Sequence, residues 1–111
     1  MSEKSNMPIG NPFDLEKFID YAKDSVISKT IFKREIGNLT LFSFDQDQGL
    51  SEHTAPYDAI VYILDGQAQI IIGGKPCDVS KGEMLVMPAN ISHALKATKP
   101  FKMLLTMIRG N

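Results

Sequence analysis

The feature of this sequence that most limits its fold is a regular series of turn signals after Tyr57. Short alternating apolar segments in this part of the chain are separated by Asp65-Gly66, Gly73-Gly74, Lys81-Gly82, Pro88-Ala89-Asn90 and Lys99-Pro100. Glycine, asparagine and aspartate tolerate the positive φ angles of tight turns, and proline cannot donate to a central strand ladder. We predict that Asp65-Gly66 is a two-residue hairpin turn. Strands divided by turns about every eight to ten residues are typical of an antiparallel sandwich or barrel.

The segment AIVYIL, residues 59–64, favours a barrel over an open sheet. Its two faces are both apolar and carry Ala59, Val61 and Ile63 on one side and Ile60, Tyr62 and Leu64 on the other. Antiparallel strands with one solvated face alternate between apolar and polar residues, so both faces of this strand must be covered. The barrel core covers the inner face. We expect an N-terminal helix or a second subunit to cover the outer face, which predicts a homodimer.

The N-terminal region predicts a short amphipathic helix that packs on the barrel. Asn11 suits the N-cap position, and Pro12 suits the first helical position. The apolar side chains with helical spacing are Leu15, Phe18, Ile19 and Ala22. We therefore predict one helix over residues 12–22, preceded by a flexible arm over residues 1–10.

Length and charge exclude several functional classes. The 111 residues, 43% of them hydrophobic, suit one folded domain over residues 11–111, with the barrel at residues 25–109. The formal net charge of -1 offers no basic excess for nucleic acid. No apolar run approaches the roughly 20 residues that span a bilayer, so no membrane role is expected. Cys77 is the only cysteine and the first residues lack a secretory pattern, which favours a cytoplasmic protein.

Two histidines, His53 and His93, are the residues that point to a chemical function. In the segment ISHALKAT, strand alternation places His93 on the same face as Leu95 and Ala97. Lys96 lies on the opposite face. Since Leu95 and Ala97 suit the interior, we expect His93 to point into the barrel. The residues around His53 do not define which face is inside.

The spacing around these histidines resembles the two motifs of the cupin superfamily, G-x5-H-x-H-x3-4-E-x6-G and G-x5-P-x-G-x2-H-x3-N. The residues that match are His53, Gly66, Gly82, Pro88 and His93. Asn90 replaces the inner glycine of the second motif, and Ala97 replaces its last asparagine. The resemblance covers residues 35–109. It implies a small all-β antiparallel barrel of jelly-roll type, which is usually dimeric.

The resemblance is incomplete at the metal-binding positions. Metal-binding cupins hold the ion with three histidines and one glutamate, and only His53 and His93 match here. Ala55 stands at the second histidine position and Ala59 at the glutamate position. The resemblance therefore implies either a metal-free pocket or a weakly bound divalent iron, manganese, nickel, zinc or copper ion. In the second case, a substrate completes the shell, because catalytic sites normally keep at least three protein ligands.

Other side chains are candidates for a third ligand. Tyr57 has the same strand parity as Ala59, and Gln46, Gln48 and Glu52 lie shortly before His53. Methionine thioethers beside the histidines would favour Cu(I), although methionines more often fill irregular cores.

We predict that the barrel binds a small polar molecule, with His53 and His93 contacting that molecule or partly holding a metal. Further candidate lining residues, chosen by strand parity, are Tyr57, Val61, Met87, Leu95, Met103 and Leu105. One alternative is a metal-dependent cupin enzyme of the dioxygenase or isomerase–epimerase type. Without metal, His93 would serve such an enzyme as general acid or base. Another alternative is a sensor or accessory protein that acts through its dimer surface.

Overall fold

The structure is a computed structural model that describes residues 4–5 and 7–109. The described residues form nine strands and one short 3₁₀ turn. In chain order these are β1 (Lys4–Ser5), η1 (Glu16–Phe18), β2 (Val26–Arg34), β3 (Gly37–Phe44), β4 (Gly49–His53), β5 (Ala59–Ile72), β6 (Lys75–Ser80), β7 (Met84–Met87), β8 (His93–Lys96) and β9 (Phe101–Ile108). Every strand pairing is antiparallel.

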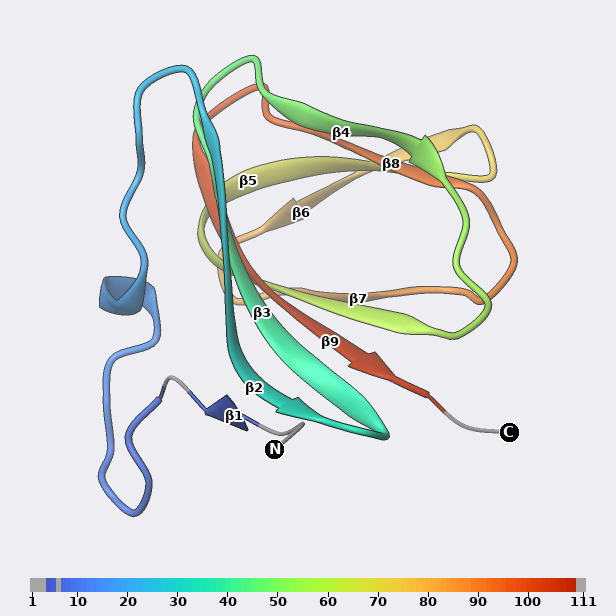
Figure 1. Cartoon of the computed structure of the whole chain (residues 1–111). Coiled ribbons are helices and arrows are strands. Elements are labelled where there is room, and N and C mark those ends of the chain that lie inside the picture. The colour runs from blue at the N-terminus through green and yellow to red at the C-terminus, as the bar shows by residue number, and fades with distance from the viewer. Residues whose placement is uncertain (1–3, 6, 110–111) are drawn as a thin grey trace.

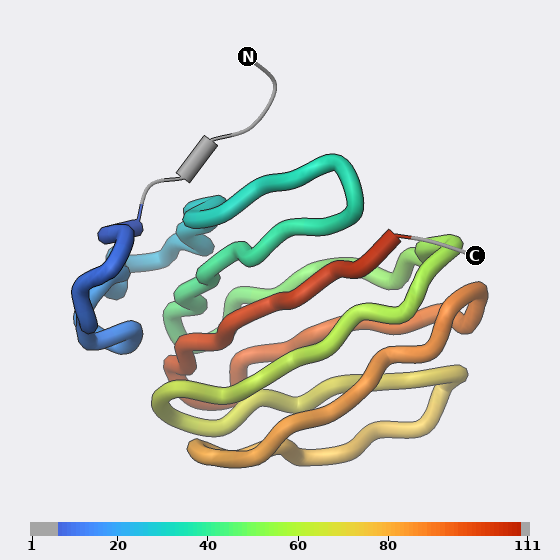
Figure 2. The backbone as a smooth tube through the Cα atoms, turned by 90° about the horizontal axis from the view of Figure 1, so that it is seen from below, coloured from blue at the N-terminus to red at the C-terminus, as the bar shows by residue number. Residues whose placement is uncertain are grey.

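The long strand β5 joins the two walls of the barrel. Its first half pairs with β7 and β9, and its second half pairs with β6 and β8. The large wall has the order β1-β2-β3-β9-β5-β7, and the small wall has the order β4-β8-β5-β6. The last strand, β9, thus lies between β3 and β5 in the large wall. The two walls face each other as one curled sheet (Figure 1 and Figure 2). This confirms the predicted all-β jelly-roll barrel.

Side chains from both walls fill the interior. The inner face of the AIVYIL segment is buried, with Ala59, Val61 and Ile63 at most 2% exposed. Phe44 and Phe101 stack with ring centroids 4.4 Å apart and close one end of the barrel. The prediction that this face of the strand packs in the barrel core is therefore confirmed.

The predicted hairpin turn at Asp65-Gly66 is wrong, because both residues lie inside β5. The pairing of β5 with β9 shifts register between Ile63 and Asp65, and Gly66 has a φ of 76°. A Cβ atom at Gly66 would also clash with the carbonyl oxygen of Pro100. Asp65 and Gly66 instead form a bulge in β5, where this strand passes from the large wall to the small wall.

The predicted helix over residues 12–22 is also wrong. Only η1 is helical, and it has three residues. Side chains of the barrel hydrogen-bond to backbone carbonyls of this segment and hold it against the sheet. Lys102 Nζ donates to Glu16 O, Lys29 Nζ donates to Phe18 O, and Ser43 Oγ donates to Asp20 O, at 2.9, 3.0 and 2.8 Å. These tertiary hydrogen bonds outweigh the local helical pattern.

The N-terminal segment, residues 7–22, nevertheless covers part of the outer face of the large wall. Ile19 is 4% exposed and packs with Ile31 and Leu41. Leu64 of β5 packs against the same cluster. The segment therefore covers the barrel as predicted for a helix, but it does so in an extended form, outside β2 and β3 (Figure 1).

The predicted N-terminal arm, residues 1–10, contains a two-residue strand. Lys4 and Ser5 pair with Lys33 and Phe32 as β1. Residues 1–3 and 6 lie outside the described part of the chain. Within the described residues, no helix has the length and apolar character needed to cross a membrane.

Candidate functional site

His53 and His93 lie together at the barrel end opposite the stacked phenylalanine rings. His53 ends β4, His93 begins β8, and the two residues are register partners in the small wall. Their ring centroids are 4.4 Å apart, and the ring planes meet at 72°. His93 is 4% exposed and lies on the inner face with Leu95, as its alternation predicts, whereas His53 is exposed. Strand pairing thus brings together two residues that are 40 positions apart in sequence.

Backbone hydrogen bonds fix the tautomer of both rings. The Nδ1 atom of His53 lies 2.7 Å from Ser51 O, and that of His93 lies 3.3 Å from Ile91 O. A carbonyl oxygen only accepts hydrogen bonds, so each Nδ1 carries a proton and donates. In the neutral ring, Nε2 then keeps a lone pair. Each ring therefore has one nitrogen engaged with the protein and one nitrogen able to accept a hydrogen bond or bind a metal.

The electrostatic setting favours a neutral ring at His93. Burial lowers the pKa of His93 below its ordinary value, and the nearby charge of His53 lowers it further. The hydrogen bond to Ile91 raises the pKa and only partly offsets these effects. His93 is therefore a hydrogen-bond acceptor through Nε2 at neutral pH, not a cation.

Two loops at this end of the barrel are tied to each other. Asn90 N donates to Ala55 O, and Ala89 N donates to Asp58 Oδ1, both at 2.8 Å. Asn90 has a φ of 64°, which asparagine tolerates better than other residues with a side chain. This explains how asparagine can replace glycine in the second motif. The loops that follow His53 and precede His93 are thus held in a fixed relation.

Ala59, which stands where the family motif has a glutamate, is packed among apolar side chains. Ala59 is 2% exposed and pairs across the sheet with Met87 and Met107. Met87 is itself 2% exposed, and Met107 packs on the same core. Apolar side chains therefore surround the place where a carboxylate would stand.

Most of the predicted lining residues lie in the barrel interior. Val61, Met87, Leu95 and Met103 belong to the buried core, and Leu105 packs against it. Tyr57 is different, because it lines a hollow on the outer face of the large wall.

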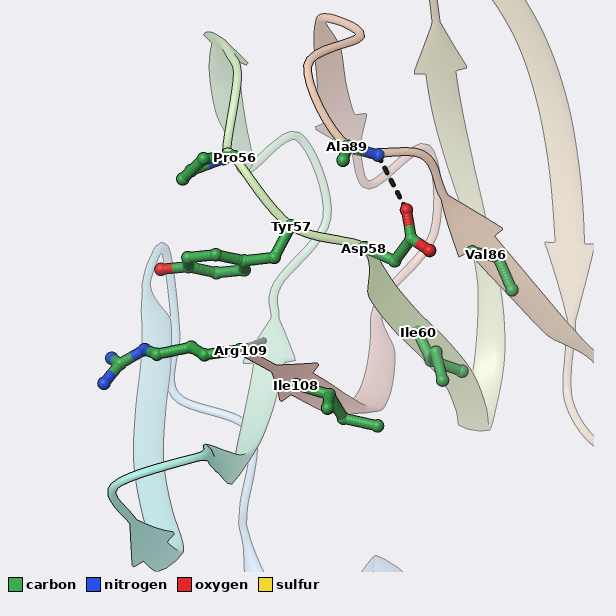
Figure 3. A pocket seen from close by; sticks show the side chains of 8 residues that line it. All are labelled: Pro56, Tyr57, Asp58, Ile60, Val86, Ala89, Ile108 and Arg109. Atoms are coloured by element: carbon green, nitrogen blue, oxygen red, sulfur yellow. Dashed lines mark hydrogen bonds between the residues drawn. The ribbon is translucent and has the colours of Figure 1, made fainter. Parts of the chain in front are cut away.

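This outer hollow has a volume of about 480 Å³ and is shown in Figure 3. Its lining residues are Pro56, Tyr57, Asp58, Ile60, Val86, Ala89, Ile108 and Arg109. Tyr57 and Arg109 lie side by side, with the guanidinium carbon 5.9 Å from the ring centroid. Sequence reasoning did not single out Val86, Ile108 or Arg109. The apolar outer side of the AIVYIL segment was the signal that could have found this surface.

The donor set does not form a complete metal site. Among residues 4–5 and 7–109, no three His, Cys, Asp or Glu side chains gather in a metal-binding group, so Glu52 does not join the histidines. The pair would supply two imidazole ligands, and the described residues supply no carboxylate or third imidazole to complete the shell.

Comparison with known proteins agrees with the barrel fold described above. The model of the cupin domain family matches residues 40–108. A conserved protein of unknown function from Streptococcus pyogenes is 36% identical and has a TM-score of 0.92, with 100% of this chain and 97% of that chain covered. A cupin 2 conserved barrel domain protein from Leptotrichia buccalis is 39% identical, with a TM-score of 0.84 over 87% of this chain and 47% of that chain.

A curated relative has a named activity. The chain is 29% identical over 89 residues to a Clostridioides difficile protein called acetate kinase EutQ. That match covers 79% of this chain and 50% of the relative. The chain therefore spans about half the length of the curated relative it matches.

Proposed function

This chain belongs to the cupin family, and we propose that it binds a small polar molecule at the histidine end of its barrel. The observation that carries the proposal is the His53–His93 pair, in which both Nδ1 atoms are engaged and both Nε2 atoms are left to accept. The buried core below the pair limits the depth of the site. The methionines beside Ala59 support a shallow site at the mouth instead of a deep cavity.

The hydrogen-bonding roles of the pair narrow the chemistry of the ligand. Two imidazoles that accept through Nε2 match a molecule that presents two neighbouring hydrogen-bond donors, such as vicinal hydroxyls or an amine. A carboxylate would bring another acceptor against two acceptors. Polyols, sugars and amines are therefore the favoured ligand classes.

A thermal-shift screen with these three classes tests the proposal. We expect at least one class to raise the melting temperature of the wild-type protein. We expect the rise to disappear in His53→Ala and in His93→Ala, because each change removes one acceptor. Glu52→Ala is the matched control, since its exposed side chain neighbours His53 in sequence and makes no metal-binding group. A ligand that stabilises the His53→Ala/His93→Ala double variant as strongly as the wild type would contradict the proposal.

The second candidate is a metal-dependent cupin enzyme in which the substrate supplies the missing ligands. The observation that supports it is the close approach of the two imidazole rings, whose centroids are 4.4 Å apart. Nε2 of His53 and Nε2 of His93 would hold the ion, which would act as a Lewis acid. Because the described donors do not complete the shell, the protein alone is expected to hold such an ion weakly.

Elemental mass spectrometry on untagged protein separates the two candidates. Iron, manganese, nickel, zinc or copper at one ion per chain, lost in the His53→Ala/His93→Ala double variant, would support the enzyme. Negligible metal after reconstitution would support direct binding. Acetate kinase activity is not part of either candidate, because Gly73-Gly74 forms a hairpin turn and not a phosphate loop.

We also propose that the protein is a cytoplasmic homodimer. The free Cys77 suits a reducing compartment. The apolar outer face of the large wall supports a dimer.

A further inference from the structure

The inner face of the large wall carries polar side chains as well as the apolar core. On β3, Phe42 and Phe44 belong to the interior cluster, whereas Leu41 belongs to the cluster on the outer face. Side chains alternate between the two faces of a strand, so Asn38 and Thr40 face the interior together with the phenylalanines. The barrel interior therefore contains polar groups besides the histidine pair.

Lys33 of β2 lies beside these polar residues. It is the register partner of Asn38. Directly opposed residues of an antiparallel pair project from the same face, so Lys33 is also on the inner side. The alternation along β2 agrees, because the preceding residue, Phe32, pairs with Leu39 of the outer cluster. Lys33 is exposed and brings a positive charge next to the Asn38 amide.

Hydrogen bonds fix which end of the Asn38 amide is engaged. The Oγ1 atom of Thr40 donates to Oδ1 of Asn38 at 3.2 Å, and it lies 3.1 Å from Oγ1 of Thr30. A hydroxyl has one proton to donate, so Thr30 is the donor in the second contact. Because Asn38 accepts through Oδ1, its Nδ2 group is the donor end of this chain of hydrogen bonds. The large wall thus presents an amide donor and an ammonium group side by side.

Strand register places Asn38 at the same end of the barrel as the histidines. Asn38 pairs with Met107, and Met107 pairs with Ala59 at the start of β5. Ile72 at the end of β5 pairs with His93. The bulge in β5 lies midway between these two ends, and the strand turns back there, so both of its ends reach one end of the barrel (Figure 1 and Figure 2). The histidine pair on the small wall therefore has a polar counterpart on the large wall.

Apolar side chains separate the two polar regions. Met107 of β9 stands between Asn38 and Ala59 and packs on the core. Neighbouring strands lie about 4.8 Å apart, so two strand spacings place Asn38 about 10 Å from Ala59. A ligand that contacts both polar regions must therefore be elongated, with an apolar middle.

We propose that the ligand is an elongated amino acid whose amine lies against the histidine pair and whose carboxylate is bound by Lys33 and Asn38. The Nε2 atoms of both histidines accept hydrogen bonds, which suits the amine. An ammonium group beside an amide donor suits a carboxylate. The methylene chain of the ligand would lie over Met107. The inference rests on the proposed binding of a small polar molecule and adds the far end of that molecule and the two residues that select it.

Calorimetric titration of the full chain with three matched ligands tests the proposal. These are ε-aminocaproate, hexylamine, which lacks the carboxylate, and caproate, which lacks the amine. We expect the wild-type protein to bind ε-aminocaproate about 10-fold more tightly than either, because hydrogen bonds to charged groups are the strong ones. Asn38→Asp keeps the acceptor for Thr40 but replaces the amide donor by a negative charge, so the preference over hexylamine should be lost. Lys33→Met should reduce that preference by about 2- to 5-fold, because its ammonium group is exposed.

The matched control is Lys81→Met. Lys81 is exposed like Lys33, but its backbone bonds to Gly66 at the opposite end of the barrel, so all three affinities should stay unchanged. Circular dichroism melting confirms that each variant is folded.

The outcomes separate this inference from the proposed function. A wild type that binds hexylamine through the histidines without preferring ε-aminocaproate would overturn the inference alone. The same holds if the preference persists in both Asn38→Asp and Lys33→Met, or if only polyols and sugars bind. If no polyol, sugar or amine stabilises the wild type, both the inference and the proposed function are overturned.

Discussion

The two ends of the barrel use their side chains in opposite ways. At one end, Phe44 and Phe101 are both fully buried and stacked. At the other end, His53 and His93 meet edge to face, and each keeps one nitrogen without a described hydrogen bond. The first end is closed by apolar packing, and the second leaves polar atoms ready for a ligand. The comparison separates residues that mainly stabilise the fold from residues that mainly serve a function.

The sharpest test of this comparison is Phe101→Ala at the closed end. Removing a fully buried ring should cost about 3–5 kcal/mol of the free energy of unfolding. Urea unfolding followed by circular dichroism measures this loss. Phe42→Ala should cost less, because Phe42 is only partly buried beside Phe44. Equal losses in the two variants would show that the closed end is no more tightly packed than its surroundings.

The glycine of the β5 bend gives the next largest effect. Gly66→Ala should destabilise by more than the roughly 1–2 kcal/mol that left-handed strain alone costs a residue with a Cβ. The added Cβ would also meet the Pro100 backbone, which cannot move without shifting β9. Gly74→Ala is the control, because Gly74 has a φ of 83° but open space around it. If both variants lose the same stability in urea, the close approach to Pro100 has no energetic weight.

A smaller effect is expected from Asn90 at the histidine end. Asn90→Ala should cost about 1 kcal/mol, since alanine tolerates its positive φ less well. Asn90→Gly should stay within a few tenths of the wild type, because the backbone hydrogen bond to Ala55 remains. Thermal melts of the two variants, run side by side, measure the difference. A glycine variant as unstable as the alanine variant would mean that the asparagine side chain itself holds the loop.

The smallest effect is a pH dependence of stability that comes from His93. Its pKa is lowered in the folded state, mainly by burial, so the unfolded chain binds the proton more readily. The stability from the neutral folded ring is therefore present above the unfolded pKa of about 6.5 and is lost as pH falls below it. In His93→Gln, the urea concentration at the unfolding midpoint should change less with pH than in the wild type, over the range from about pH 5 to 8. If the urea midpoint of His93→Gln varies with pH as steeply as that of the wild type, groups other than His93 cause the pH dependence.

Strand alternation in the sequence was a sound guide to the barrel and to the inward direction of His93. It failed at Asp65-Gly66, because the same dipeptide serves a hairpin turn and a bulge, and the register against β9 decides between them. It also failed for residues 12–22. Their apolar side chains do have helical spacing, but Lys29 of β2 and Lys102 of β9 donate hydrogen bonds to backbone carbonyls of this segment, which local patterns do not predict.

The histidine pair could be predicted only in part. Each residue was identified through the family motif, but their contact depends on the pairing of β4 with β8, which local patterns do not determine. The place of Arg109 beside Tyr57 was not predictable, because it arises from β9 lying next to β5. Strand parity placed Val61, Met87 and Leu95 correctly in the interior, together with Met103 and Leu105. It misplaced Tyr57, which precedes β5 and lines the outer hollow.

The central place of β9 has a consequence for synthesis of the protein. A ribosome makes Phe101–Ile108 after every other strand, yet this strand lies between β3 and β5. Until it emerges, the strand that joins β3 to the first half of β5 is missing. The nascent chain must therefore remain soluble with its large wall divided, and completion of the barrel is a late event that depends on contacts distant in sequence.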